Sequence, residues 1–194
     1  DQHFFGEASR LAGDAPVPIL HVKDRKHAPG GAANVCLDLA ALKGEVKAFG
    51  VSGRDEAAGC LRAALQESLI ECAGVIADDS RPTTVKQNLV GMAQGRHPQK
   101  MFRVDVESRD PISAVVEDAV LEAFERELGY TDVVCIEDYA KGVCTERLCR
   151  TVIELAGRAG KPIFVDPAPI SDYAKYAGAT AITPNRTEAE LATG

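Results

Sequence analysis

A pair of adjacent glycines lies in the first segment of the chain that could hold a polar ligand against the backbone. The segment reads Pro29-Gly30-Gly31-Ala32-Ala33-Asn34. Because glycine has no Cβ, Gly30 and Gly31 let a ligand approach the main chain closely, and the helix start that follows offers N–H groups to an anion. Asn34 can hydrogen-bond to sugar hydroxyls. The alternative is an ordinary loop-to-helix turn with Asn34 near the cap.

A second segment, Thr183-Pro184-Asn185-Arg186-Thr187-Glu188, follows an apolar stretch that ends at Ile182. At a helix start in this place, Asn185 could lie near transferring phosphates. Glu188 could bind a water of a magnesium ion, because magnesium usually keeps several of its waters. The alternative is a capping box, in which Asn185 and Glu188 only satisfy the first N–H groups of the helix.

Two further polar segments follow strand-like stretches, as ligand-binding residues do in open α/β sheets. The first is Asp138-Tyr139-Ala140-Lys141-Gly142, in which Lys141 could bind a phosphate and Asp138 a hydroxyl. The second is Asp166-Pro167, at the equivalent place after the next strand-like stretch. Both could instead be solvated loops.

Three charged residues are expected to share one face of a hairpin. Arg103 and Asp105 lie two residues apart on one strand, and Lys86 lies on its partner. This face could bind a phosphosugar, or it could be the solvent-exposed face of a small sheet. The four histidines have neither metal-site nor triad spacing, so we interpret them as surface or packing residues.

The elements that must position these residues alternate between strands and helices. Apolar spacing predicts helices at 32–43, 55–68, 112–128 and 145–159, and strands at 46–51, 69–76, 133–136, 162–165 and 179–182. Strands separated by such helices indicate βαβ units and an α/β fold with a mostly parallel sheet. The continuous apolar stretch at 133–136 is typical of a sheet that is covered on both faces.

Two stretches depart from this alternation and predict a small antiparallel sheet outside the main layer. Residues 15–23 are extended and contain prolines, which suit an edge strand. Residues 83–92 and 100–106 alternate around a turn and indicate a hairpin. We expect segments of about 14–23 and 82–106 to form a lid or a dimer contact.

Composition excludes several classes of function. The net charge of −7 argues against a nucleic-acid-binding protein, and no apolar run approaches the ~20 residues of a membrane helix. The six cysteines form no CxxC pair, so we expect buried, reduced thiols rather than disulfides or zinc ligands. Reduced thiols favour a cytoplasmic location.

The combination of these motifs, in this order, resembles the ribokinase-like (PfkB) carbohydrate kinases. Within that family the chain is most similar to the heptose-7-phosphate kinase domain of ADP-heptose synthesis proteins. The likeness extends over nearly the whole chain and includes Gly6-Glu7-Ala8-Ser9-Arg10, Ala15-Pro16-Val17-Pro18, Thr83-Thr84-Val85-Lys86, Arg103-Val104-Asp105 and Asp138-Tyr139-Ala140-Lys141-Gly142. The resemblance therefore implies a ribokinase-like fold with helices on both faces of the sheet and a β lid.

The resemblance also implies a reaction and a set of binding residues. ATP with Mg²⁺ would phosphorylate the anomeric hydroxyl of a heptose 7-phosphate, a precursor of ADP-heptose and lipopolysaccharide. Asn185 and Glu188 would serve ATP and magnesium, Glu188 through a water. The lid would support a homodimer. The residues implied at or near the sugar and its phosphate are Asp1, Gly30, Gly31, Asn34, Lys86, Arg103, Asp105, Asp138 and Lys141.

The chain departs from the family pattern in four ways. It has no Gly-Ala-Gly-Asp segment, which supplies the family's catalytic aspartate and anion hole, and no strand before Asp1. We therefore expect an incomplete kinase domain over residues 1–194 that is inactive alone. Asn88 stands where the heptose group usually carries Arg, and Ala168 where a basic residue is common. A kinase for another sugar or a nucleoside, or a non-catalytic sugar-binding and dimerisation module, stays open.

Overall fold

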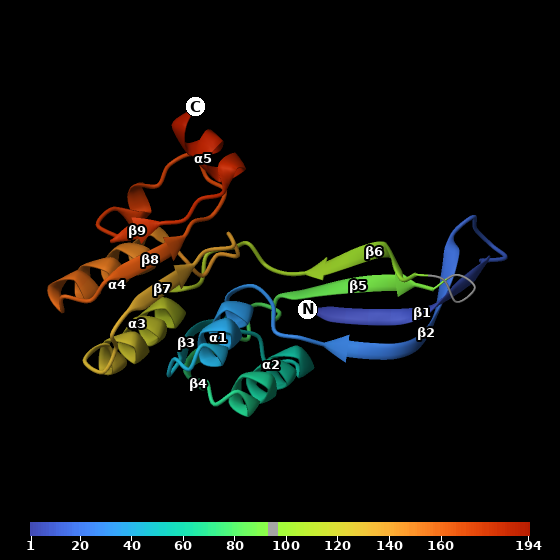
Figure 1. The fold of residues 1–194 in the computed structure, drawn as a ribbon, viewed down its shortest axis with the longest axis horizontal. Helices are drawn as coiled ribbons and strands as arrows, with labels where there is room; N and C mark the ends of the chain where they lie inside the picture. Colours follow the sequence, from blue (N-terminus) through green and yellow to red (C-terminus); the bar gives the residue numbers. More distant parts are fainter. Residues whose placement is uncertain (93–96) are drawn as a thin grey trace.

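The computed structural model describes residues 1–92 and 97–194, which form an α/β body and a projecting β arm (Figure 1). The strands of the arm are β1 (Gln2–Leu11), β2 (Pro18–His27), β5 (Val85–Gly91) and β6 (Gln99–Val106). Those of the body are β3 (Lys47–Ser52), β4 (Glu71–Ala77), β7 (Val134–Glu137), β8 (Ile163–Asp166) and β9 (Ala181–Ile182). The helices are α1 (Ala32–Ala41), α2 (Glu56–Glu67), α3 (Ala114–Leu128), α4 (Glu146–Arg158), a 3₁₀ turn η1 (Ala174–Tyr176) and α5 (Arg186–Thr193).

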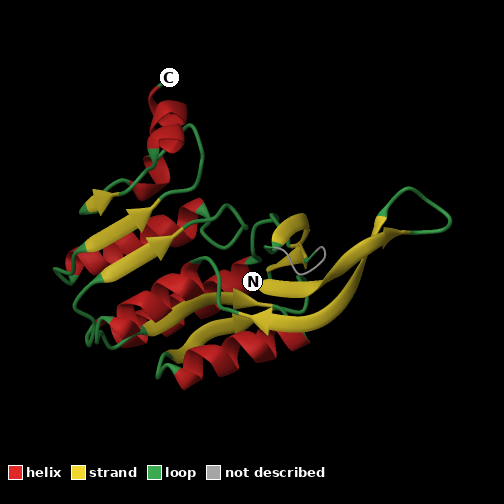
Figure 2. Cartoon of the chain, turned by 45° about the vertical axis from the view of Figure 1, so that its right-hand side comes forward, coloured by secondary structure: helices red, strands yellow, loops and turns green. Residues whose placement is uncertain are grey.

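The body contains two groups of parallel strands. One is the β3–β4 pair, and the other has the order β7-β8-β9. Helices α1 and α2 contact the first group, and α3 also packs on β3 and β4. Figure 2 shows α3 and α4 lying along the strands of the body. This confirms the predicted class, an α/β fold with parallel strands joined through helices.

The main core lies between α3, α4 and strands β7 and β8. Alternate residues of the two strands are buried there, namely Val134, Ile136, Ile163 and Val165. Phe124 of α3 extends the core to β3, where its ring packs edge-on against Phe49 at a centroid distance of 5.7 Å. The period of two on each strand and the amphipathic pattern of the helices bring these residues together.

The opposite face of β7 and β8 differs from the expectation of a sheet covered on both sides. Cys135 and Phe164 are partners in the β7–β8 register, and both are exposed. Their exposure follows from strand alternation, because their neighbours already face α3 and α4. The prediction of buried thiols holds for Cys72 and Cys149 and is wrong for Cys60 and Cys135; all six cysteines are free.

The arm is one four-stranded sheet with the order β2-β1-β5-β6. Antiparallel pairing was expected, and the β1–β2 and β5–β6 pairs are antiparallel, but β1 and β5 run parallel. Strand β1 was not predicted, because Gly6-Glu7-Ala8-Ser9-Arg10 has little β-branched or aromatic character. Its ladder partners on both sides provide the hydrogen bonds that hold it extended.

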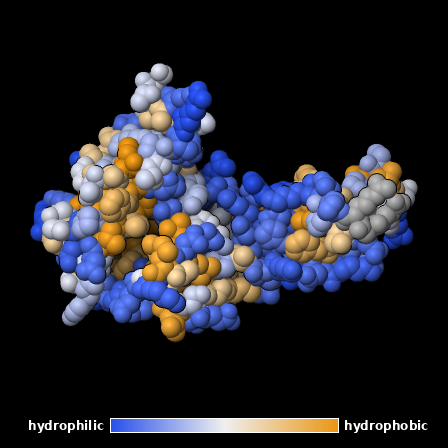
Figure 3. Space-filling view, in the orientation of Figure 1, coloured by the Kyte–Doolittle hydropathy of each residue, from blue (hydrophilic) through white to orange (hydrophobic). Residues whose placement is uncertain are grey.

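Most predicted helices and strands of the body appear within a few residues of their expected ends. Asp55, Ser113 and Thr145 cap α2, α3 and α4, each accepting a hydrogen bond from the backbone N–H three residues on. In the described residues, no helix combines the length and the apolar character that crossing a bilayer requires. The arm is mainly hydrophilic on the face shown in Figure 3, whereas hydrophobic side chains gather on the body.

Candidate functional site

The junction between the arm and α1 brings Asp1 against the glycine pair. A Cβ built on Gly30 would lie 2.8 Å from Cγ of Asp1, so a larger residue here would push this carboxylate aside. Gly31 is the N-cap of α1 with φ 53° and ψ −134°, a conformation that L side chains rarely adopt. Backbone hydrogen bonds in both directions between Asp1 and Ala28 hold the two segments together. Gly31 is therefore favoured by its backbone conformation, and Gly30 leaves room for the Asp1 carboxylate.

Lys86 reaches the same junction from the arm. Gln2 pairs with Gln87 in the parallel β1–β5 ladder, so the residues just before them, Asp1 and Lys86, lie beside each other. Lys86 is half-buried and faces Asp105 across the β5–β6 ladder. The structure thus brings together four of the sequence-predicted residues: Asp1, Gly30, Gly31 and Lys86.

Arg103 and Asp105 share the arm face with Lys86, as their spacing predicted. Their side chains form a two-pronged pair, with Nε and Nη2 of Arg103 donating to the Asp105 carboxylate at 2.8 and 2.9 Å. Arg103 stands opposite the buried Asn88 in the ladder. The face is therefore polar and internally paired, so a phosphate has to compete with Asp105 for this arginine.

The loop after β7 meets both the glycine pair and the arm. The ring of Tyr139 lies where a Cβ on Gly31 would contact it, at 3.3 Å. The Lys141 ammonium lies 2.5 Å from Oε2 of Glu107, in the connection from β6 to α3. Contact with Lys141 lowers the pKa of Glu107, and a hydrogen bond from Arg109 adds to the effect. Lys141 is thus close to the arm but already neutralised by a carboxylate.

Asp138 directly follows β7, as predicted, but its carboxylate is buried rather than open to a ligand. Its side chain is only 2 % exposed. Oδ2 accepts hydrogen bonds from Lys175 Nζ at 2.5 Å and from the Tyr176 hydroxyl at 2.8 Å, while Oδ1 accepts from the Ala140 N–H. Burial raises the pKa of Tyr176, and its hydrogen bond to Asp138 adds to the rise. In this position, the Asp138 carboxylate has little surface to offer a sugar hydroxyl.

The carboxyl ends of β7 and β8 carry two neighbouring acidic residues. Glu137 and Asp166 are partners in the parallel register. Burial raises the pKa of Glu137, and the negative charge of Asp166 raises it further. Thr183, which follows β9, donates a hydrogen bond to Oδ1 of Asp166 at 3.2 Å. The ends of all three strands therefore meet at one polar edge, where open α/β sheets bind ligands.

The start of α5 is a complete capping box. Oδ1 of Asn185 accepts the N–H of Glu188 at 3.1 Å, and Oε2 of Glu188 accepts the N–H of Asn185 at 2.8 Å. On α1, the Asn34 side chain donates to Asp38 at 3.1 Å. Each of these three side chains has a structural partner, and the Asn34 N–H also donates to the Gly31 carbonyl at 2.9 Å.

Several residues that shape the site were missed by sequence reasoning. Arg81 is buried between the body and the arm, where Nη1 donates to the carbonyl of Lys141 at 3.1 Å and Nη2 to that of Asp110. Its place in the Arg81-Pro82-Thr83-Thr84 stretch was an available signal, because Thr83 and Thr84 had been singled out. Lys175 and Tyr176 had no such signal, since they reach Asp138 from a distant turn.

Comparison with known proteins places the chain in one family. The family model for the pfkB family carbohydrate kinases matches residues 4–194. The bifunctional protein HldE of Wolinella succinogenes is 40% identical over 194 residues, covering 100% of this chain and 40% of the relative. HldE of Caulobacter vibrioides is 41% identical over the same length and is covered to 38%. The chain thus spans about two fifths of the length of these curated relatives.

Solved structures agree on the fold. Arabidopsis thaliana ribokinase, complexed with ribose and ATP, superposes with a TM-score of 0.66 at 16% identity, covering 100% of this chain and 59% of that one. A PfkB protein from Polaromonas gives a TM-score of 0.61 at 20% identity, covering 99% and 68%. The resemblance inferred from the motifs is confirmed: the chain belongs to the pfkB family of carbohydrate kinases.

Proposed function

We propose that this chain forms the sugar-binding part and a portion of the nucleotide-binding part of an ATP-dependent kinase that phosphorylates heptose 7-phosphate at its anomeric hydroxyl. The observation that carries the proposal is the junction of Asp1, Gly30, Gly31 and Lys86, in a chain about 40% identical to HldE proteins over its full length. The product would enter ADP-heptose synthesis for lipopolysaccharide.

In this proposal the sugar ring lies against the glycine pair. Asp1 accepts hydrogen bonds from sugar hydroxyls, and the backbone of Gly30 and Gly31 approaches the ring because no Cβ intervenes. Asn34 on α1 supplies a further amide to the hydroxyls, once it exchanges its bond to Asp38. Asp138 contributes by fixing the loop that carries Tyr139 and Lys141, since its own carboxylate is buried.

The 7-phosphate would lie toward the arm, where the cationic side chains are. Lys86 and Arg103 share one face of the sheet, and Lys141 comes from the neighbouring loop. Asp105 and Glu107 hold Arg103 and Lys141 in place and keep the site neutral without substrate. A dianionic phosphate would then compete for these cations, and charge-assisted hydrogen bonds favour it over a neutral sugar.

The far edge of the body suits ATP and magnesium. Glu137 and Asp166 at the carboxyl ends of β7 and β8, and Glu188 in the first turn of α5, offer the oxygen ligands that magnesium prefers. Glu188 would bind the ion through a water, and Asn185 would lie by the phosphates. Bound there, Mg-ATP supplies the phosphoryl group and neutralises its charge; the contribution of these residues is to hold and orient it.

The β arm would act as a lid over the sugar and as a dimer contact. Its second face carries Phe102, Val104 and Val106, whose exposed fractions are 66%, 38% and 41%. Such an apolar row on a sheet is costly to leave in water, so we propose that a second copy covers it. We place the protein in the cytoplasm, in keeping with its six free cysteines.

Ligand-induced stabilisation tests the acceptor. The melting temperature of the protein is measured with heptose 7-phosphate, with unphosphorylated heptose, with ribose and with adenosine. We expect the phosphorylated heptose to stabilise most, by about 2.7 kcal/mol at a hundredfold excess over its Kd. Lys86→Ala should lose the preference for the phosphorylated sugar, whereas Lys23→Ala, at an exposed position of β2, should keep it.

The other outcomes distinguish the alternatives. Stronger stabilisation by ribose or adenosine would indicate a kinase for that acceptor instead. The 194 residues contain no Gly-Ala-Gly-Asp segment, so we expect them to transfer no phosphate from ATP by themselves, because base and anion hole are essential to transfer. Sugar binding without turnover by the full gene product would favour a non-catalytic binding module.

A further inference from the structure

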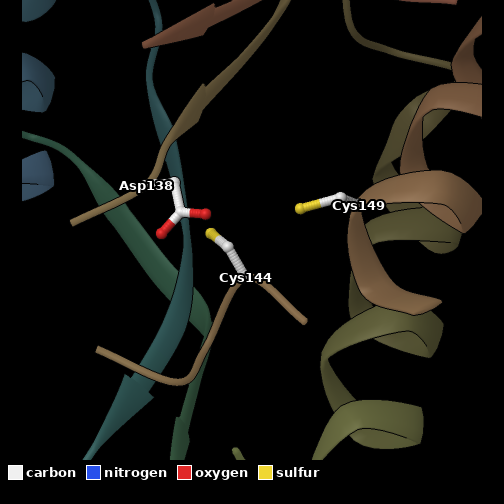
Figure 4. A group of neighbouring side chains, drawn as sticks. All are labelled: Asp138, Cys144 and Cys149. Carbon is white, nitrogen blue, oxygen red and sulfur yellow. The ribbon is translucent and has the colours of Figure 1, made fainter. Parts of the chain in front are cut away.

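A cluster of two thiols and a carboxylate lies beneath the loop that follows β7. The side chains belong to Asp138, to Cys144 just before α4, and to Cys149 on the second turn of that helix. One ligand atom from each of the three lies within 4.8 Å of the other two. Figure 4 shows both sulfur atoms and the carboxylate directed into the same space.

Helix geometry explains how the two cysteines meet. Thr145 is the N-cap of α4, so Cys144 occupies the N′ position and Cys149 the N4 position. Residues at N′ and N4 pack together as a hydrophobic staple, and small apolar thiols suit that role. The staple accounts for the two thiols lying together, while the Asp138 carboxylate beside them is held by Lys175, Tyr176 and the Ala140 N–H.

The separations match a shared cation better than a disulfide. Zinc binds thiolate sulfur at about 2.3 Å and carboxylate oxygen at about 2.0–2.2 Å, so ligand atoms on a tetrahedral ion lie roughly 3.5–3.8 Å apart. All three ligand atoms lie within 4.8 Å of one another, so reaching this spacing needs a contraction of at most about 1.3 Å. A disulfide needs the sulfurs at about 2.0 Å, a much larger movement for two residues fixed at one helix start.

The surroundings also balance the charge of such a site. Two thiolates and one carboxylate around a dication leave a net charge of −1, and the ammonium of Lys175 supplies +1. Lys175 and Tyr176 both donate to Oδ2 of Asp138, which is the arrangement that commonly orients a ligating carboxylate from behind. Cys149 is fully buried, whereas Cys144 is half-buried.

We propose that Asp138, Cys144 and Cys149 bind one thiophilic divalent cation such as Zn²⁺, with Lys175 and Tyr176 positioning the carboxylate. Binding releases the two thiol protons to solvent, and no electron is transferred. The site lies outside the edge assigned to magnesium and does not depend on the kinase activity. A bound cation would fasten the loop at 138–142 to α4.

Cobalt titration of the reduced, metal-stripped protein tests the proposal. We expect one Co²⁺ per chain, with the intense visible and charge-transfer absorption of a tetrahedral thiolate site, and displacement by Zn²⁺. Cys144→Ala and Cys149→Ser should each abolish the charge-transfer absorption. The matched control is Cys60→Ser, at an exposed position on α2, and it should bind like the wild type. Tyr176→Phe should weaken affinity about tenfold.

Two results would overturn the site. One is wild-type protein that shows no thiolate absorption with Co²⁺, and the other is absorption that survives in both cysteine variants. Because Cys149→Ser could unfold the protein, circular dichroism is recorded for each variant, and alkylation of wild-type thiols with and without Zn²⁺ gives a second measurement. Zinc should protect Cys144 and Cys149 together. A wild-type mass lighter by two hydrogens, with both thiols lost, would show a disulfide instead.

Discussion

The ammonium group of Lys141 lies 2.5 Å from a carboxylate oxygen of Glu107, and this pair ties the loop after β7 to the strand that leaves the arm. The same two segments are joined by the Ile112 N–H, which donates to the Gly142 carbonyl at 3.0 Å. Arg81 adds hydrogen bonds to both. The segment that leaves the arm is therefore fastened to the loop of Lys141, the residue that we place near the phosphate.

Replacing Glu107 by Gln should make stability less dependent on pH in the acid range. The pKa of Glu107 is lowered in the folded protein, chiefly by contact with Lys141, so the pair stabilises the fold above the unfolded pKa. That stabilisation is lost as pH falls below the ordinary value of 4.5 toward the lower folded value. Denaturant melts at neutral and acid pH should show Glu107→Gln less stable at neutral pH, with the gap closing under acid conditions. A constant gap would contradict the argument.

Gly31→Ala should both destabilise the protein and weaken sugar binding. The backbone at φ 53° is strained for alanine, and its Cβ would contact the Tyr139 ring at 3.3 Å. Conformational strain of this kind costs about 1–3 kcal/mol. The free energy of unfolding from urea melts measures the first effect, and ligand-induced stabilisation by heptose 7-phosphate measures the second.

The control for that variant is Gly59→Ala. Gly59 lies inside α2, where a Cβ would meet no atom within 4 Å. Alanine there should stabilise the protein by roughly 0.5–1 kcal/mol, because it restricts the unfolded chain and favours the helix. If both variants shifted stability in the same direction, the close approach at Gly31 would not be the cause.

Asp55→Ala should lower the free energy of unfolding by more than the loss of a helix cap alone would. The Asp55 carboxylate accepts from the Ala58 N–H at 2.9 Å as the cap of α2, and from the Thr83 N–H at 2.8 Å in the connection to the arm. We expect a loss of about 1–3 kcal/mol in urea melts. Ser113→Ala, which removes only the cap of α3, should lose about 1 kcal/mol or less. Equal losses would mean that the bond to Thr83 adds nothing.

Local signals in the sequence predicted the body of the fold well. Asp55 precedes a run of apolar residues at helical spacing, and this pattern predicts α2 and its cap. The glycine pair predicts the start of α1. The capping box of Asn185 and Glu188 was also expected as an alternative to a ligand site. These features depend on contacts between residues within one helical turn of each other, so the local sequence is sufficient to predict them.

Contacts across the chain could not be predicted in the same way. Lys175 reaches Asp138 over a separation of 37 residues, and Arg81 reaches Lys141 over 60. Strand β1 forms because β2 and β5 pair with it on both sides. Asp138 was assigned to a hydroxyl because it follows a strand, yet burial by a distant turn decides which partners it has.

The exposed apolar face of the arm leads to a last prediction, on oligomeric state. Phe102→Asp should give a monomer in sedimentation equilibrium, because a charge on the most exposed residue of the Phe102, Val104 and Val106 row cannot be buried against its copy without a partner. Phe164→Asp is the matched control, since Phe164 is also exposed but lies on the body. It should sediment as the wild type does. A wild-type monomer, or dissociation caused only by Phe164→Asp, would move the interface from the arm to the body.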